Sequence, residues 1–83
     1  MRYALVVVRL LNATDAGVQD VGVRIPVPLT NDYQQVLGVQ FAPHPTGFEP
    51  IPEGGKLAFF KIPRVGPRQV EWVWMLVRCR LLA

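Results

Sequence analysis

Apolar and polar residues alternate along most of this chain, which is the period of a β-strand whose two faces meet different surroundings. Clusters of Gly, Pro, Asn and Asp interrupt the alternation, and these are the residues that turns require. No segment shows the helical period together with helix caps, so the pattern indicates an all-β chain. The predicted strands are Arg2–Leu11, Val21–Val27, Gln34–Ala42, Lys56–Ile62 and Gln69–Leu82.

Proline positions indicate how these strands are arranged. Pro26 has no N–H to donate to a neighbouring strand, so its strand is expected at a sheet edge or at a kink where the chain changes sheets. The segment Pro43–Pro52 is too rich in proline for a central strand and is expected to run extended along an edge, before a tight turn at Glu53–Gly55. We therefore expect a single domain, residues 1–83, folded as a small two-sheet sandwich of about six or seven antiparallel strands.

The last predicted strand has an ambiguous parity. Strict alternation places its two tryptophans on the same face as two arginines, whereas Cys79 lies on the opposite, apolar face. Either a bulge switches the parity within the strand, or the tryptophan face is covered by a partner. The tryptophan face consists of Val70, Trp72, Trp74, Leu76, Arg78 and Arg80, and the opposite face of Val73, Met75, Val77, Cys79 and Leu81.

Composition adds an expectation of association. Of the 83 residues, 51% are hydrophobic and 18% are charged, which excludes intrinsic disorder. A chain this short and this apolar has more hydrophobic side chains than one core can hold, so part of the surplus is expected at an interface. The opening segment MRYALVVVRLL is interrupted by Arg9 and reads as a strand and not as a signal peptide, and no apolar run is long enough to span a membrane. A cytoplasmic protein is the default expectation.

Residues that carry chemistry are few and scattered. Cys79 is the only cysteine and His44 the only histidine, and we interpret them as a buried apolar residue and a surface loop residue. The carboxylates lie mostly in or beside turns, where they are ordinarily solvated or cap the chain. Gly54-Gly55-Lys56 lacks the spacing of a phosphate loop and fits a hairpin turn. The sequence predicts no enzyme, no catalytic residue, no metal site and no cofactor.

The order of these signals resembles an immunoglobulin-like module. In particular, it resembles the non-catalytic N-terminal β-sandwich that precedes the catalytic domain in many bacterial transglutaminase-like proteins. The resemblance implies an immunoglobulin-like sandwich with an accessory role. Since the catalytic Cys, His and Asp of that family belong to another domain, it implies no catalytic residue here. The positions that carry the resemblance are Asn12, Asp15, Val21–Pro28, Tyr33–Val36, Gly54–Phe60 and the strand from Val70.

We therefore expect a non-enzymatic β-sandwich module that works by association. It would form a homo-oligomer, for instance a dimer through the last strand, or pack on a neighbouring catalytic domain. The alternative is a binder of nucleic acid or another anionic polymer that uses the tryptophans as a stacking platform beside the arginines. The net charge of +3 is too small for a nucleic-acid footprint, which makes nucleic acid the weaker partner. The candidate interface residues are Trp72, Trp74, Leu76, Arg78 and Arg80.

Overall fold

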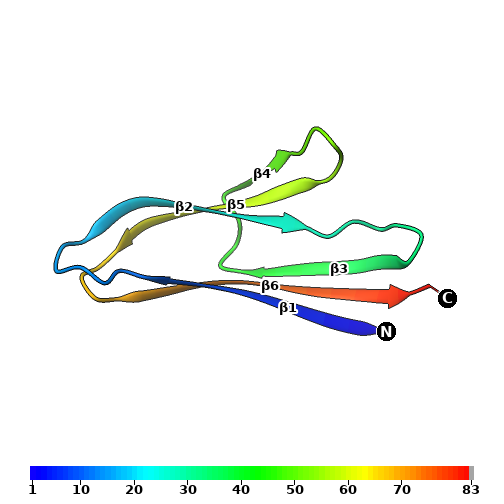
Figure 1. Ribbon diagram of the computed structural model, residues 1–83, viewed down its shortest axis with the longest axis horizontal. Helices are drawn as coiled ribbons and strands as arrows, with labels where there is room; N and C mark the ends of the chain where they lie inside the picture. Colours follow the sequence, from blue (N-terminus) through cyan, green and yellow to red (C-terminus); the bar gives the residue numbers. More distant parts are fainter. Residues whose placement is uncertain (83) are drawn as a thin grey trace.

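A computed structural model describes residues 1–82, which form two antiparallel three-stranded sheets packed face to face (Figure 1). Sheet A has the strand order β1-β6-β3, and sheet B has the order β2-β5-β4. The chain is thus all-β and built as a two-sheet sandwich, as the alternation predicts. The strands are β1 (Arg2–Leu11), β2 (Val18–Val27), β3 (Gln34–Ala42), β4 (Gly47–Pro50), β5 (Lys56–Val65) and β6 (Val70–Leu81). Within residues 1–82, no helix has the length and apolarity needed to span a bilayer.

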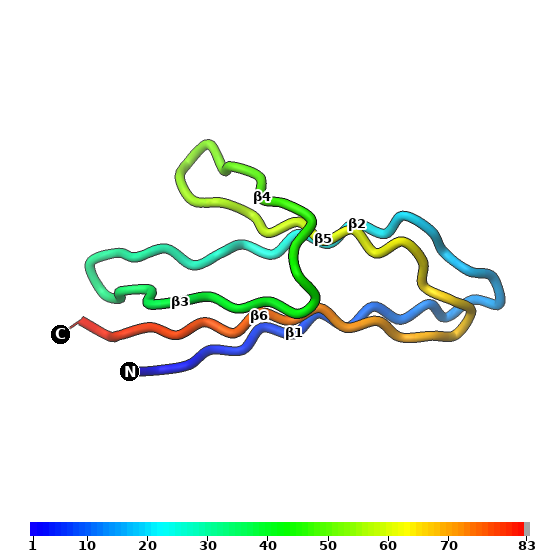
Figure 2. Tube along the Cα trace, turned by 180° about the vertical axis from the view of Figure 1, so that it is seen from behind, coloured from blue at the N-terminus to red at the C-terminus, as the bar shows by residue number. Residues whose placement is uncertain are grey.

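Every connection except the β4–β5 hairpin crosses from one sheet to the other. The β1–β2 and β5–β6 connections cross between the sheets at one end of the sandwich, and the β2–β3 connection crosses at the other end (Figure 1). The segment between β3 and β4 climbs from sheet A to sheet B near the middle of the molecule (Figure 2). As a result β6 is the central strand of sheet A and β5 the central strand of sheet B.

The bounds of β1 and β3 agree with the sequence prediction, whereas β2 and β5 extend three residues further at their paired ends. In that extension Asp20 adopts a left-handed φ of 56°, which Asp tolerates better than most residues. The register pairs Gln19 with Arg64 and Val21 with Ile62, so Asp20 lies at the level of Pro63. The prediction that the strand ends at Ile62 was wrong, because Pro63 is tolerated at an irregularity shared by both strands.

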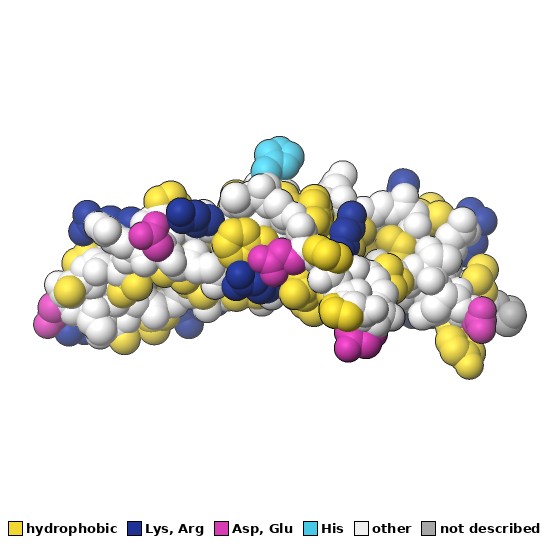
Figure 3. All heavy atoms as spheres, turned by 90° about the horizontal axis from the view of Figure 1, so that it is seen from above, with side chains coloured by type: hydrophobic (Ala, Val, Ile, Leu, Met, Phe, Trp, Pro, Cys, Tyr) yellow, Lys and Arg dark blue, Asp and Glu magenta, His cyan; other side chains and the backbone are white. Residues whose placement is uncertain are grey.

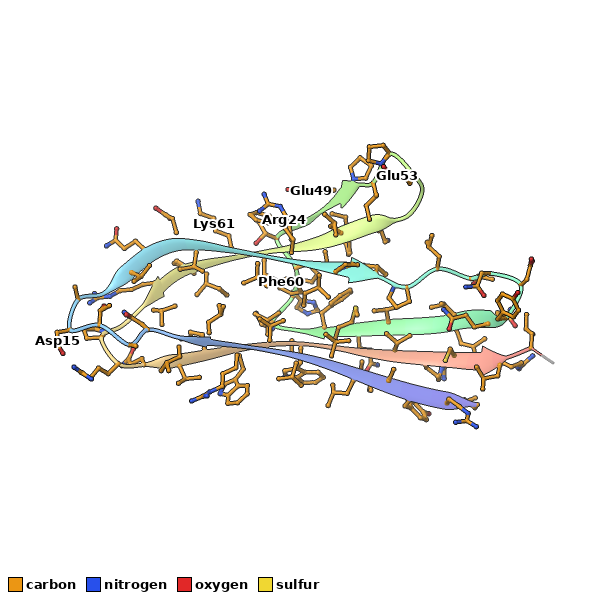
Figure 4. The ribbon with its side chains drawn as sticks, viewed as in Figure 1. Asp15, Arg24, Glu49, Glu53, Phe60 and Lys61 are labelled. Atoms are coloured by element: carbon orange, nitrogen blue, oxygen red, sulfur yellow. The ribbon has the colours of Figure 1, made fainter. Side chains whose placement is uncertain are left out.

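The core is one layer of side chains between the sheets. Phe60 of β5 is fully buried and points into the space between the layers (Figure 4). Its ring lies 5.8 Å from that of Phe41 on β3, which in turn lies 6.0 Å from Phe48 on β4. This aromatic row joins both sheets through three different strands. The buried cluster consists of Val23, Ile25, Ala58, Phe60, Ile62, Val65, Val73, Met75 and Val77.

Asn12, directly after β1, is the buried polar residue of the sandwich. Its side-chain amide donates to the carbonyl of Ala16 at 2.7 Å and to those of Val65 and Gly66 at 3.1 Å each. Its side-chain oxygen accepts from the backbone N–H of Thr14 at 3.1 Å and from the Thr14 hydroxyl at 2.6 Å. One side chain therefore links the β1–β2 turn to the β5–β6 connection.

The sandwich is long and thin. It extends over 51 × 26 × 17 Å with a radius of gyration of 15.1 Å, against about 12 Å for a typical domain of this length. Its accessible surface is 5859 Å², whereas a compact monomer of this mass exposes about 5,000 Å². Two three-stranded sheets thus leave an unusually large part of the chain at the surface.

We predict that Asn12→Ala lowers the free energy of unfolding by about 3 kcal/mol, because it removes the three hydrogen bonds that this buried amide donates and the two that its oxygen accepts. Thr14→Ala is the matched control. Thr14→Ala removes the hydroxyl that donates to the Asn12 side-chain oxygen but keeps the Thr14 N–H that donates to the same oxygen, so we expect a loss of about 1 kcal/mol or less. Urea denaturation followed by circular dichroism measures both values. Equal values for the two variants would show that the Asn12 side chain does not hold this end together.

Candidate association surface

Strand β6 keeps a single parity over its whole length. Its register with β1 runs without a shift from Val70 to Cys79, and the bulge in sheet A lies in β3, between Val36 and Gly38. A bulge that switches the parity of β6 is therefore the wrong one of the two alternatives. Val73, Met75, Val77 and Cys79 face the core, and the tryptophan face points outward.

The five candidate interface residues lie together on the outer face of sheet A. Trp72 is 53% exposed and Trp74 38%, so neither tryptophan is a core residue. Across the register, the outward residues of β1 extend this face. Leu5 is 60% exposed opposite Leu76, and Val7 lies opposite Trp74. We call this surface the outer face of sheet A; it consists of Tyr3, Leu5, Val7, Arg9 and Leu11 from β1 and Trp72, Trp74, Leu76, Arg78 and Arg80 from β6.

The contribution of β1 to this face was missed in the sequence. Both faces of β1 are apolar, with Tyr3, Leu5 and Val7 on one side and Val6 and Val8 on the other. Periodicity therefore does not tell which face turns inward. The register with β6 settles it, because paired residues of neighbouring strands point to the same side of a sheet.

The charges of the outer face of sheet A are all positive. Arg9 lies over the Trp72 ring, with its guanidinium carbon 5.9 Å from the ring centroid. Among residues 1–82, neither Arg9 nor Arg78 nor Arg80 makes a salt bridge. Desolvating these arginines against an apolar surface alone would be unfavourable.

Sheet B presents a different outer surface, in which charges of both signs lie among the apolar side chains (Figure 3). Arg24 of β2 pairs with Glu49 of β4 at 2.9 Å, and the hydrogen bond to Glu49 raises the pKa of Arg24. The same guanidinium lies 4.7 Å from the Phe59 ring centroid and covers that ring. Lys61 approaches Asp20 at 3.8 Å. Sheet B is thus the side with internally paired charges.

A hollow of about 340 Å³ lies where the outer face of sheet A meets the outward residues of β3. Its lining combines apolar and hydrogen-bonding side chains, and consists of Tyr3, Gly38, Gln40, Leu76 and Arg78. Gly38 helps to keep it open, since a Cβ atom built there would have only the Arg78 side chain within 4 Å, at 3.8 Å. The hollow offers one side chain of a partner an apolar contact with Leu76 and donors from Arg78 and Gln40.

A second groove, of about 460 Å³, lies near Asn12 between the end of β1 and the start of β2. Its lining is mainly aliphatic and includes Leu10, Val18, Val21 and Val65. The polar atoms of Asn12 are already bonded within the fold, so they offer nothing to a ligand. This groove continues the apolar core to the surface and offers a ligand no unbonded polar group of Asn12.

The residues considered for catalysis are not gathered into a site. Cys79 is buried on the core face of β6, as interpreted from the alternation. His44 is exposed between β3 and β4. Gly54 and Gly55 have φ values of 114° and 88° and form the turn between β4 and β5, which confirms the hairpin interpretation. Over the described range 1–82, no group of three or more His, Cys, Asp or Glu side chains is placed to hold a metal ion.

No family model, no curated protein and no solved structure matches the chain. The resemblance to the N-terminal sandwich of transglutaminase-like proteins therefore stays a prediction from the sequence.

We predict that both indoles are open to solvent in the isolated chain, and that Trp72 is the more open of the two. Trp74→Phe leaves Trp72 as the only tryptophan, and Trp72→Phe leaves Trp74. Acrylamide quenching of fluorescence in dilute protein should be stronger for Trp74→Phe, because Trp72 is 53% exposed and Trp74 38%. Weak quenching of both variants would contradict an outward tryptophan face.

Proposed function

We propose that the chain is a non-enzymatic protein-association module that uses the outer face of sheet A as its contact surface. The observation that carries this proposal is a continuous row of exposed apolar residues on two neighbouring strands, centred on Trp74 and Leu76. Exposed aromatic side chains surrounded by aliphatic ones and arginines are typical of residues that dominate binding energy.

The amount of exposed surface supports this proposal. The accessible surface of 5859 Å² exceeds that of a compact monomer of the same mass by about 900 Å². A standard protein interface buries about 800 Å² on each partner. The surplus is therefore about the size of one interface.

Charge favours a different protein surface over a second copy in face-to-face contact. A face-to-face pair would bring Arg9, Arg78 and Arg80 of both copies into one desolvated interface without a carboxylate from either outer face. Like charges brought together in this way are destabilising. A neighbouring domain that brings both apolar and acidic side chains satisfies the face, which supports the accessory role that the resemblance implies.

A dimer through the last strand, as expected from the sequence, would have to use the outward face of β6 and not its edges. Both edges of β6 are occupied, by β1 on one side and by β3 on the other. Only the outward face of β6 is accessible to a partner.

Strand order supports an immunoglobulin-like classification of the sandwich. An immunoglobulin domain pairs its strands B, E and D in one sheet and C, F and G in the other. The order β2-β5-β4 corresponds to B-E-D, and β3-β6 corresponds to C-F. The position of G is filled by β1, from the opposite end of the chain. The proposed fold is thus immunoglobulin-like with its edge strand supplied by the N-terminal segment.

Binding of an anionic polymer is the second candidate, because Trp72 lies in cation–π contact with Arg9 on the same face as Arg78 and Arg80. Such binding would weaken steeply as salt is added. Under the association proposal we expect no saturable binding of single-stranded DNA or heparin at physiological salt, measured by fluorescence anisotropy. Saturable, salt-dependent binding that is lost in Arg78→Gln plus Arg80→Gln would overturn this expectation.

For the association proposal, we predict that the double substitution Trp72→Ala plus Trp74→Ala leaves the chain folded and weakens its retention on a phenyl column. Both side chains are largely outside the core, so we expect the free energy of unfolding to change by about 1 kcal/mol or less. Leu29→Ala is the matched control, since Leu29 is half-exposed but lies in the loop after β2.

Retention of Leu29→Ala should equal that of the unaltered chain. A folded double variant with unchanged retention would show that another surface is the main apolar one. Loss of the folded circular dichroism spectrum in the double variant would instead assign both tryptophans to the core.

A further inference from the structure

Three of the four sheet edges in residues 1–82 are closed to strand pairing. On β2, Pro26 lacks a donor and Asp20 is left-handed, with a φ of 56°. Strand β4 has four residues and ends at Pro50. Proline, irregular backbone and short length are the features by which natural sheets protect their edges.

The edge of β3 is protected by the loop that precedes it. The Asn31 side-chain oxygen accepts from the backbone N–H of Gln34 at 3.0 Å, and the Asn31 N–H donates to the Gln34 carbonyl at 2.9 Å. The Thr30 hydroxyl accepts from the N–H of Val36 at 3.0 Å. The bulge at Leu37 follows directly. The first half of this edge is therefore already bonded, and its second half is out of register with the first.

Strand β1 lacks all of these protections. It spans ten residues, contains neither proline nor glycine, and keeps an unbroken register with β6. Its outer edge has no neighbouring strand in the described part of the chain. A long, regular, apolar edge strand of this kind is a template for pairing with another strand.

The phase of the β1–β6 ladder shows which backbone groups are free. The N–H of Asn12 donates to the carbonyl of Gln69, one step beyond β1 in the same register. Residues of an antiparallel pair alternate between hydrogen-bonded and non-hydrogen-bonded positions, so the even-numbered residues of β1 bond to β6. The residues whose N–H and C=O groups point away from β6 are Tyr3, Leu5, Val7, Arg9 and Leu11.

We propose that the β1 edge pairs antiparallel with β1 of a second copy of this chain, around a two-fold axis at Val7, so that the two sheets A form one continuous sheet. Paired residues must point to the same side of the sheet. The two-fold axis therefore lies between one residue and its own counterpart in the second copy, and not between two different residues. Centring on Val7 pairs all five outward-bonding residues of β1: Val7 with its counterpart, Leu5 with Arg9, and Tyr3 with Leu11.

This register is self-complementary on the core side of the sheet. Ala4 and Val6 lie on the core face of β1, yet both are exposed, Val6 by 39%, whereas Val8 and Leu10 are partly buried. Pairing around Val7 places Val8 of the second copy beside Val6, and its Leu10 beside Ala4. The partly buried residues Val8 and Leu10 of each copy thus shield the exposed residues Val6 and Ala4 of the other from solvent.

Charge is compatible with the same register. The charged residues of β1 are Arg2 and Arg9. In this register Arg9 lies opposite Leu5 and Arg2 opposite Asn12, so no arginine lies opposite another. This site goes beyond the proposed function, because it uses the edge of sheet A and leaves its outer face free in both copies.

The test is the solution mass by light scattering over a dilution series, for the unaltered chain, Val7→Pro and Val7→Thr. Proline at Val7 removes an N–H that β6 does not use, whereas Val7→Thr keeps it. We expect dimers for the unaltered chain and for Val7→Thr, and at least a tenfold higher dissociation constant for Val7→Pro. A monomeric unaltered chain at the highest concentration would overturn the proposal.

The Trp72→Ala plus Trp74→Ala variant separates this proposal from the proposed function. It should remain dimeric, because it leaves the edge intact. A dimer that is lost in this variant and kept in Val7→Pro would assign self-association to the outer face and contradict edge pairing.

Disulfide trapping keeps the proposal testable if Val7→Pro fails to fold. Under mild oxidation we expect Val7→Cys to cross-link to itself. Tyr3→Cys and Leu11→Cys should cross-link when mixed, and neither should do so alone. Cross-linking of Tyr3→Cys or Leu11→Cys alone, or no cross-link in Val7→Cys, would show that the register is wrong. The native Cys79 is buried and gives the background level.

Discussion

The hydrogen bonds of the Asn12 side chain hold together the end of the sandwich where the β1–β2 and β5–β6 connections cross between the sheets. The amide reaches the carbonyls of Ala16, Val65 and Gly66, and so fixes the β1–β2 turn against the end of β5. The Asn12 N–H also bonds to Gln69 in the β1–β6 register. A shift of that register by one residue would turn the apolar outward residues of β1 into the core and move its free backbone groups to the other parity. Both proposed contact surfaces therefore depend on Asn12, through its backbone N–H in the register and its side chain at the turn.

Sheet width explains why so much surface is left for association. A three-stranded sheet has one central strand and two edges, so only β5 and β6 are paired on both sides. The core is correspondingly one layer centred on Phe60, Val73 and Met75, which are the largest fully buried side chains. Arg24 and Glu49 supply paired charges to the outer face of sheet B, whereas the arginines of sheet A have no such partner among residues 1–82. The asymmetry between the two outer faces follows from this distribution of carboxylates.

Local pattern predicted what depends on one strand at a time. The bounds of β1 and β3, the edge position of Pro26 and the core orientation of Cys79 all follow from alternation and from the missing proline donor. Features that depend on two strands were missed. Asp20 is left-handed at the level of Pro63, and neither residue alone indicates that β5 continues to Val65. The central position of β6, and with it the joining of the β1 and β6 outward residues, is likewise set by pairing between distant segments, which alternation within one strand does not encode.

The face and the edge are built from the same residues of β1. In an antiparallel strand, a residue's side-chain direction and the direction of its backbone hydrogen bonds alternate together, so Tyr3, Leu5 and Val7 supply side chains to the outer face and free N–H and C=O groups to the edge. If two copies pair at this edge, their outer faces become one surface that carries Arg9, Arg78 and Arg80 from each copy. Edge pairing therefore raises the positive charge of the face that the neighbouring domain would contact. It strengthens the requirement that this domain bring carboxylates, and it makes a third copy of the same chain a poor occupant of that face.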